Sequence, residues 1–336
     1  MKELANLALE GKRVFLRGDI DVPIENGVIQ DTERLKLLSP TISYLLERNS
    51  RVLLVGHIGR PKNNQDFSLS TKTLLTMLSS LLNINVVHFH RIEGVEVPPL
   101  TLGLLENLRF WPEEEKNDPT FAKQLANLAD VYVNEAFADC HREHASIVGV
   151  PRFLPHAAGL RLEKEVEVLS RVLANPKRPQ VVIIGGVKLE TKIPVIGNLA
   201  KTADLVLVGG LIASEAQEKN IEVTNNVILA KLTPDKKDID EESVKKFCEK
   251  IETAAQIIWN GPMGVFEKPE SETGTTEIAR TIAKSPAEKI VGGGQTIQAL
   301  KKYQILGKMD WVSSGGGAML EFLSGKTLPG IEVLES

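Results

Sequence analysis

Short runs of apolar and β-branched residues recur along the whole chain, and most of them are separated by segments in which apolar residues have helical spacing. The runs predict strands at 13–17, 51–56, 85–89, 102–106, 131–134, 181–185, 204–208, 256–259, 289–292 and 311–313. The intervening segments predict helices at 35–47, 71–82, 119–128 and 241–251. Continuously apolar strands that alternate with amphipathic helices are typical of an α/β fold with parallel sheets.

The number of predicted strands, about ten, is large for a single sheet, so we expect two sheets. The segment 151–179 is the predicted junction, because it contains a predicted helix at 163–173 followed by the breaker-rich run from Asn175 to Pro179. With 336 residues, the chain is long enough for two domains that each bury a core.

Candidate chemistry is concentrated just after the predicted strands, where open parallel sheets bind their ligands. In the first half these positions carry mostly arginine, histidine and aspartate: Arg17, Asp19, Asp21, Arg34, His57, Gly59, Arg60, Asn107, Arg109, Asn134, His141 and Arg142. In the second half they carry glycine turns with lysine and asparagine: Gly185, Gly186, Lys188, Lys192, Gly209, Gly210, Asn260, Gly261, 292–294 and 315–317. The two halves therefore predict different ligands.

The chemistry of these side chains suggests which ligand each half would take. Guanidinium groups bind carboxylate and phosphate oxygens through paired donors, so the first half suits a small anion. Glycine turns at helix N-termini let backbone N–H groups approach phosphates, and the helix dipole favours negative charge there, so the second half suits a nucleotide. Two such clefts facing each other across a hinge would suit phosphoryl transfer in a closed state that excludes water.

Composition and charge limit the classes of function. The chain is 42% hydrophobic and 25% charged, which is ordinary for a globular protein, and its net charge of −4 argues against general nucleic-acid binding. Two cysteines cannot form a disulfide framework, and no signal peptide or membrane-spanning segment is recognisable. We therefore expect a soluble cytoplasmic protein with neither a membrane nor a nucleic-acid partner.

Other classes of site have less support in the sequence. It contains no P-loop pattern and no protein-kinase motifs, and no Gly-x-Gly-x-x-Gly fingerprint opens the first βαβ unit, as an NAD-dependent oxidoreductase would require. Cys140, His141 and His144 have a spacing that mimics a metal site, but the sequence offers no fourth ligand nearby.

Several stretches of the sequence follow one another in the order found in the phosphoglycerate kinase family, which the chain resembles along nearly its whole length. They are Arg17–Pro23, Val55–Pro61, Glu106–Phe110, His141–Ser146, Gly185–Lys192, Trp259–Glu267, Gly292–Thr296 and Ser313–Ala318. Any one of these stretches would be a weak signal alone, but their shared order makes the resemblance specific.

The resemblance implies an α/β fold of two doubly wound, Rossmann-like parallel-sheet domains joined by a hinge. Residues 1–158, with a C-terminal tail at about 320–336, would bind 3-phosphoglycerate or 1,3-bisphosphoglycerate. Residues 159–319 would form the hinge helix and a domain that binds ADP or ATP with Mg²⁺. The protein would be a monomeric, hinge-bending transferase of glycolysis, which exchanges a phosphoryl group between ATP and the carboxyl group of 3-phosphoglycerate.

The resemblance also implies which residues form the two sites. Positions that match the family's phosphoglycerate site are Asp19, Ile20, Asp21, Arg34, His57, Ile58, Gly59, Arg60, Arg109 and Arg142. Positions that match its nucleotide site are Gly186, Lys188, Lys192, Gly209, Gly210, Asn260, Glu267, Gly293, Gly294, Gln295 and Thr296. The implied catalytic residues are Arg34, which would offset charge on the transferring oxygens, and Lys188, which would follow the transferred phosphoryl group.

The sequence departs from the family pattern at several positions. Gln295 stands where the family has a metal-binding aspartate, which leaves the Mg²⁺ ligand unknown, because a neutral amide is a weaker donor to this ion. Thr191 replaces an aspartate between the two lysines, and Asp21 replaces an asparagine beside an anionic substrate. The region 211–241 is shortened, and Leu211 replaces a glycine. The alternative is therefore a non-catalytic or weakly active phosphoglycerate kinase-like binding protein.

Overall fold

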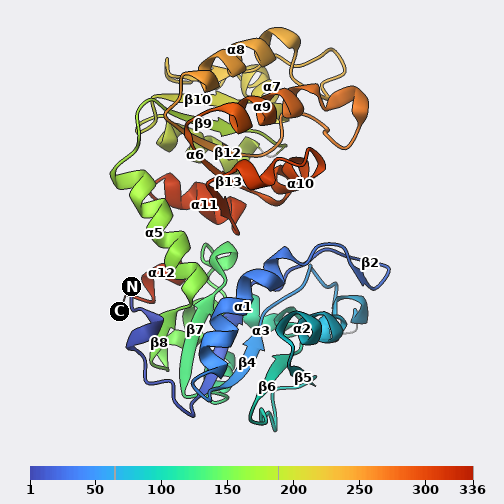
Figure 1. Ribbon diagram of the computed structural model, residues 1–336, viewed down its shortest axis with the longest axis vertical. Helices are drawn as coiled ribbons and strands as arrows, with labels where there is room; N and C mark the ends of the chain where they lie inside the picture. The colour runs from blue at the N-terminus through green and yellow to red at the C-terminus, as the bar shows by residue number, and fades with distance from the viewer. Residues whose placement is uncertain (64–65, 188, 336) are drawn as a thin grey trace. The chain divides into compact units, whose positions relative to one another are not determined.

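The computed structural model describes residues 1–63, 66–187 and 189–335. These residues form two compact units (Figure 1). The first comprises Met1–Glu167 and the residues from Thr327 onward, and the second comprises Val168–Lys326. Each unit contains a six-stranded sheet in which all neighbouring strands are parallel. The expected α/β fold with two parallel sheets is therefore confirmed.

The sheet of the first unit has the strand order β5-β6-β4-β1-β7-β8. Its strands are β1 (Arg13–Gly18), β4 (Arg51–Val55), β5 (Asn85–Phe89), β6 (Thr101–Leu105), β7 (Val131–Glu135) and β8 (His156–Ala158). Strands β4, β5 and β6 lie on one side of β1, whereas β7 and β8 lie on the other. The order therefore reverses beside β1, which is the kind of switch point where open α/β sheets bind ligands.

Helices and short turns connect the strands of the first unit. The α-helices are α1 (Glu33–Leu46), α2 (Leu75–Leu82), α3 (Pro112–Glu115), α4 (Pro119–Ala126), α5 (Leu160–Ala174), which continues into the second unit, and α12 (Pro329–Glu332). The short turns are η1 (Leu4–Asn6), η2 (Phe67–Leu69), η3 (Thr71–Leu74), η4 (Leu108–Phe110), η5 (Phe137–Asp139), η6 (Ala145–Gly149) and η7 (Val150–Arg152). An antiparallel hairpin pairs β2 (Ile24–Glu25) with β3 (Val28–Ile29).

The apolar pattern of α1 explains how this helix covers the first sheet. Its buried residues include Leu35, Leu38 and Ile42, which share one face because they are three or four positions apart. They pack in one core cluster with Leu16 of β1 and Leu54 of β4. This packing fixes the first turn of α1, which carries Arg34, beside the carboxyl end of β1.

The sheet of the second unit has the strand order β11-β10-β9-β12-β13-β14. Its strands are β9 (Gln180–Ile184), β10 (Leu205–Val208), β11 (Val227–Leu229), β12 (Gln256–Asn260), β13 (Glu288–Gly292) and β14 (Trp311–Ser313). Its helices and turns are α6 (Leu189–Leu199), α7 (Gly210–Glu218), α8 (Glu241–Glu252), η8 (Pro269–Ser271), α9 (Thr273–Lys284), α10 (Gly294–Lys302), η9 (Leu306–Lys308) and α11 (Gly316–Leu323). The strand order reverses between β9 and β12, so this unit has a switch point of its own.

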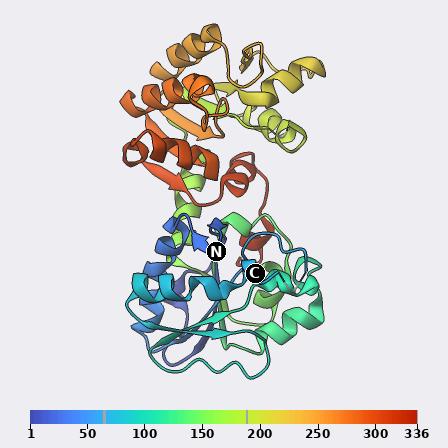
Figure 2. The same ribbon diagram turned by 90° about the vertical axis from the view of Figure 1, so that its right-hand side faces the viewer.

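The ends of the chain belong to the first unit, and both views of the ribbon show them side by side (Figures 1 and 2). The backbone N–H of Lys2 donates to the carbonyl of Leu334 at 3.2 Å, and that of Gly330 donates to Cys140 at 2.8 Å. Helix α11 belongs to the second unit, where Leu320 and Leu323 are buried. The returning segment therefore begins at Thr327, later than the expected tail at about 320.

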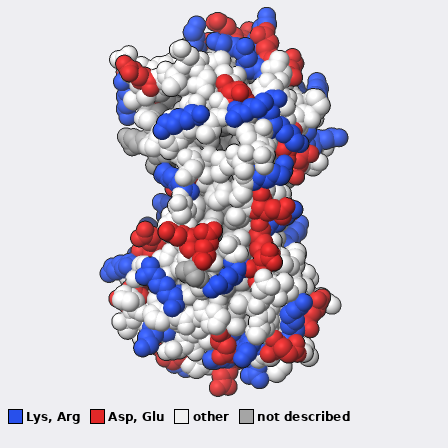
Figure 3. Space-filling model, turned by 90° about the vertical axis from the view of Figure 1, so that its left-hand side faces the viewer, with Lys and Arg blue, Asp and Glu red and all other residues white. Residues whose placement is uncertain are grey.

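Charges of both signs are interspersed over the face shown in Figure 3. This mixture agrees with the small net charge of the sequence. In the part of the chain that the structure describes, no helix combines the length and the apolar character needed to cross a membrane.

Candidate active site

The carboxyl edge of the first sheet brings together the charged residues predicted for an anion site. Asp19 and Asp21 follow β1, His57 and Gly59 follow β4, and Arg109 lies in η4 after β6. Arg142 follows η5, which itself follows β7. These strands are neighbours around the switch point, so residues that are far apart in the sequence meet at one place.

Arg34 and Asp19 form the shortest ion pair in this cluster. Nη1 of Arg34 lies 2.7 Å from Oδ1 and 2.9 Å from Oδ2 of Asp19. Burial raises the pKa of Asp19, and the Arg34 guanidinium partly offsets this effect. Asp19 in turn raises the pKa of Arg34. The remaining donors of Arg34 are partly exposed, since a third of this side chain is accessible to solvent.

A second set of contacts orders the loop after β4. The backbone N–H of Gly59 donates to Oδ1 of Asp21 at 2.7 Å, and Nη1 of Arg109 donates to the Gly59 carbonyl at 2.5 Å. Nδ2 of Asn107 donates to the carbonyl of Ile58 at 2.8 Å. Arg109 and Asp21 are thus connected through the backbone of one residue, and the loop has little freedom.

Not all of the predicted substrate-site residues present side chains to the site. The side chains of Ile20 and Ile58 are fully buried in the apolar core cluster, so only their backbone groups can face a ligand. Arg60 is exposed to solvent. Nε of Arg142 lies 3.3 Å from Oδ1 of Asp139, a buried residue of η5.

Sequence reasoning missed three residues that lie directly under this cluster: Glu114, Asp139 and Ser146. Asp139 accepts a hydrogen bond from Arg17 at 2.9 Å, and Ser146 accepts one from Arg17 at 2.9 Å. Glu114 accepts from the Ser146 hydroxyl at 2.5 Å. Asp139 could have been found, because it stands just after a predicted strand. Glu114 carries no such signal, since it lies in an acidic run that resembles ordinary surface.

In the second unit, glycine turns from separate strands pack against one another. Gly210 begins α7 at φ +65°, and a Cβ on it would lie 2.8 Å from backbone atoms of Gly186, so a side chain would force the two turns apart. Nζ of Lys192 donates to the carbonyl of Gly185 at 2.6 Å. Burial lowers the pKa of Lys192 to about 8, so the amine is still mostly protonated at neutral pH.

Asn260 connects the turns at the other side of the second switch point. Its Nδ2 donates to the carbonyls of Gly292 at 3.0 Å and Gly316 at 3.1 Å. The hydroxyl of Thr296 accepts from the backbone N–H of Gly261 at 2.7 Å. Gly293, at φ +98°, precedes α10 and comes so close to Asn260 that a Cβ would lie 3.0 Å from Nδ2.

The N-terminus of α10 is open to solvent, because Gly294 and Gln295 are exposed. Free N–H groups at this position suit an anion. Glu267 is exposed in the connection between β12 and η8. Lys188 lies outside the described residues. Among the residues that the structure does describe, no group of three or more His, Cys, Asp or Glu side chains is arranged to hold a metal ion.

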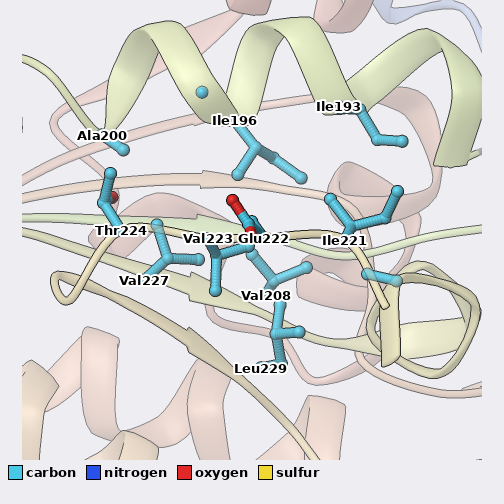
Figure 4. Close-up of a pocket in the computed structure, with 12 residues that line it drawn as sticks. Ile193, Ile196, Ala200, Val208, Ile221, Glu222, Val223, Thr224, Val227 and Leu229 are labelled. Carbon is cyan, nitrogen blue, oxygen red and sulfur yellow. The ribbon is translucent and has the colours of Figure 1, made fainter. Parts of the chain in front are cut away.

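An apolar pocket of about 110 Å³ lies elsewhere in the second unit, within and beside the region that is shortened in the sequence (Figure 4). It is lined by Ile193, Ile196, Gly197, Ala200, Val208, Ala216, Ile221, Glu222, Val223, Thr224, Val227 and Leu229. These residues come from α6 and the residue that follows it, from β10, α7 and β11, and from the segment that precedes β11. The lining has no cationic group, so it is unsuited to phosphate.

Comparison with known proteins agrees with this arrangement. The family model described as phosphoglycerate kinase matches residues 4–228 and 214–326. Proteins named phosphoglycerate kinase from Moorella thermoacetica and Pelotomaculum thermopropionicum are 40% identical over 385 residues and 39% identical over 387 residues, respectively. The alignments cover 98% and 99% of this chain and 98% of each relative. These spans exceed the 336 residues of the chain, so the relatives contain segments that it lacks.

Solved structures give the same result. The phosphoglycerate kinase from Coxiella burnetii has a TM-score of 0.83 and 34% identity, covering 99% of this chain and 98% of its own. The enzyme from Pyrococcus horikoshii has a TM-score of 0.85 and 32% identity, covering 100% and 98%. Sequence and architecture thus agree over the full length, and the chain belongs to the phosphoglycerate kinase family.

Proposed function

We propose that the protein is an active phosphoglycerate kinase of glycolysis, which reversibly transfers a phosphoryl group from 1,3-bisphosphoglycerate to ADP, giving 3-phosphoglycerate and ATP. The observation that carries this proposal is the cluster at the switch point of the first sheet, where Arg34, Arg109 and His57 meet in a chain of this family. The cluster suits an anion, and family membership supplies its identity.

The phosphoglycerate side would be the first unit. Asp19 holds Arg34 by one of its terminal nitrogens, which leaves the other nitrogen to bind a phosphate or carboxylate oxygen. Arg109 and Arg142 add positive charge, and the backbone at Gly59 is fixed between Asp21 and Arg109. In the reaction, Arg34 would offset the charge that develops on the transferring oxygens.

The nucleotide side would be the second unit. The groups that would bind phosphates are an amine and several backbone N–H groups. The amine is that of Lys192, and the N–H groups belong to the turns at Gly186 and Gly210 and to the N-terminus of α10. Asn260 and Thr296 hold three turns together, because their side chains contact the backbone of Gly292, Gly316 and Gly261. Lys188 and Glu267 complete the proposed site on the basis of their place in the family motifs.

Magnesium would reach the protein as part of the nucleotide substrate. Mg²⁺ is often held by one or two carboxylates together with substrate phosphates, and it retains several waters. Gln295 offers only a neutral amide at the start of α10, and the described residues provide no carboxylate cluster for a resident ion. We therefore assign the main hold on the ion to the phosphates of ADP or ATP.

The two proposed sites lie in different units, so transfer requires the units to approach each other and exclude water. We place this hinge bending in the connection through α5, whose residues belong to both units. No covalent intermediate with the protein is needed, because positioning and charge stabilisation are sufficient for phosphoryl transfer. We also propose that the protein acts as a cytoplasmic monomer.

The proposal is tested by measuring formation of ADP from ATP in the presence of 3-phosphoglycerate and Mg²⁺. Arg34→Ala should lower kcat by about 100-fold or more and leave the KM for ATP nearly unchanged, because Arg34 acts on the phosphoglycerate side. The matched control is Arg51→Ala, since Arg51 is exposed at the opposite end of β4. Equal losses in the two variants, or a wild type that binds 3-phosphoglycerate without turnover, would contradict the proposal.

A further inference from the structure

A buried arginine lies beneath the proposed phosphoglycerate site and contacts one of its residues. Arg17, near the end of β1, has no exposed surface. Its Nη2 donates to Oδ2 of Asp139 at 2.9 Å and lies 3.2 Å from Nδ1 of His57. His57 itself is 4% exposed. The function proposed above gives Arg17 no role of its own.

The contact between Arg17 and His57 restricts where the histidine can carry its proton. A guanidinium group is always protonated in proteins and has only donors, so Nδ1 of His57 must accept in this contact. A neutral imidazole whose Nδ1 accepts carries its proton on Nε2. The opposite nitrogen, Nε2, lies 3.8 Å from Oδ2 of Asp21, within the proposed site.

The alternative partner for Nδ1 is Asp139, which would favour a proton on that nitrogen. Nδ1 lies 3.6 Å from Oδ2 of Asp139, farther than it lies from Nη2 of Arg17. The same carboxylate oxygen already accepts from Arg17. The geometry therefore favours the state in which Arg17 donates to both groups and His57 is neutral.

Further buried contacts hold the Arg17 side chain in this orientation. Its Nε donates to the Ser146 hydroxyl at 2.9 Å, and its Nη1 donates to the Gly18 carbonyl at 2.6 Å. Ser146 in turn donates to Glu114, which is 1% exposed, at 2.5 Å from its hydroxyl and 2.9 Å from its backbone N–H. Three of the four contacts of the guanidinium described here are thus made with groups other than His57.

We infer that Arg17 is a positioning residue, which fixes His57 as a neutral ring with its proton on Nε2 and thereby presents a donor to the anionic substrate. This inference rests on the proposed function for the identity of the substrate. Such a donor would bind a phosphate or carboxylate oxygen without adding a charge that varies with pH. The arginines of the cluster would then provide all of the positive charge.

The electrostatic surroundings of His57 agree with a neutral ring. The pKa of His57 is lowered to about 4, because burial and the charges of Arg17 and Arg109 lower it more than the charges of Asp139 and Asp21 raise it. These four charged groups come from β1, η4, η5 and the loop after β1. Over the neutral range the ring should therefore remain uncharged.

The direct test is ¹⁵N NMR of the intact protein, labelled in its six histidines, at neutral pH and without substrates. His57→Gln assigns the resonances. We expect Nδ1 of His57 to show the chemical shift of an unprotonated nitrogen and Nε2 that of a protonated one. A proton on Nδ1, or a charged ring at neutral pH, would overturn the inference. Because no substrate is present, this outcome does not depend on whether the protein is an active kinase.

The role of Arg17 is tested with Arg17→Lys, which keeps the charge but cannot reproduce the guanidinium contacts. We expect the His57 resonances to move towards a mixture of tautomers and the KM for 3-phosphoglycerate to rise by about tenfold, with the KM for ATP unchanged. Arg13→Lys is the matched control, because Arg13 starts the same strand and pairs with Asp130 at 2.7 Å. Unchanged His57 resonances in folded Arg17→Lys would overturn the positioning role. If this variant does not fold, the wild-type spectrum decides.

Discussion

At the scale of single residues, Asp21 places a carboxylate inside a pocket that we propose to bind an anion. Its Oδ1 is used by the backbone N–H of Gly59, and its side chain is 38% exposed. An asparagine could accept the same hydrogen bond through its amide oxygen. The negative charge is therefore not required for the order of the loop, and it should repel the substrate.

Asp21→Asn should therefore improve binding of the substrate. We expect its KM for 3-phosphoglycerate to fall by about three- to tenfold, because a like charge near a partly exposed site costs on the order of 1 kcal/mol. The KM for ATP should not change. Initial rates at several substrate concentrations measure both values, and an increase in the KM for 3-phosphoglycerate would show that the carboxylate contributes to binding.

The sequence predicted the charged residues that face the site better than those that support it. Arg34, His57 and Arg109 could be predicted because they follow strands of a recognisable parallel sheet. The contacts beneath them could not be predicted, because Arg17 meets Asp139 and Ser146 across 122 and 129 positions of the chain. Only the folded structure shows that these segments meet. Such long-range pairs have no local sequence pattern.

At the scale of elements, the N-terminus of α5 is capped by side chains from two other elements. Glu135 lies at the end of β7. Its Oε1 accepts from the backbone N–H of Arg161 and its Oε2 accepts from that of Leu162, both at 3.0 Å. Thr41 of α1 donates its hydroxyl to Glu135 and accepts from the N–H of Leu160. The helix that continues into the second unit is therefore attached to the same helix that carries Arg34.

This cap predicts a pH dependence of stability. Burial raises the pKa of Glu135 to about 7, so at mildly acidic pH the folded protein keeps a proton that the unfolded chain has released. The stabilisation is present at low pH and is lost as the pH rises through about 7. In Glu135→Gln the amide cannot ionise. We therefore compare the free energies of unfolding of wild type and Glu135→Gln. The difference, wild type minus variant, should fall by about 2–3 kcal/mol between about pH 5 and pH 8.

Urea unfolding at the two pH values measures this difference. The control is Glu167→Gln, because Glu167 is exposed in the same helix and should show no such change. If the curves of wild type and Glu135→Gln differ by a constant amount at both pH values, the carboxyl group does not titrate in this range.

The limits of sequence-based prediction also show at the scale of elements. Long apolar runs such as β1 and β9 were predicted to within a residue or two, because five consecutive buried positions leave a clear pattern. The three-residue strands β8 and β11 were not predicted, whereas β14, which has the same length, was predicted at 311–313. The predicted helix at 71–82 begins as a 3₁₀ turn, η3, before α2.

At the scale of the whole molecule, the two units repeat one design. Each has a six-stranded parallel sheet whose order reverses near its centre, and each proposed site lies at that reversal. The units differ in what they place there: arginine, histidine and aspartate in the first, and glycine turns with lysine and asparagine in the second. This difference is the reason why we propose that phosphoglycerate binds to the first unit and the nucleotide to the second.

The most direct test of the account is to trap the product that only a carboxyl acceptor can give. Hydroxylamine converts an acyl phosphate into a stable hydroxamate, so purified protein is mixed with Mg-ATP, 3-phosphoglycerate and hydroxylamine. We predict hydroxamate and ADP in equal amounts, both dependent on 3-phosphoglycerate and both greatly reduced by Arg34→Ala. ADP without hydroxamate, or no ADP from folded protein that binds both substrates, would contradict the central claim that this chain transfers a phosphoryl group to and from a carboxyl group.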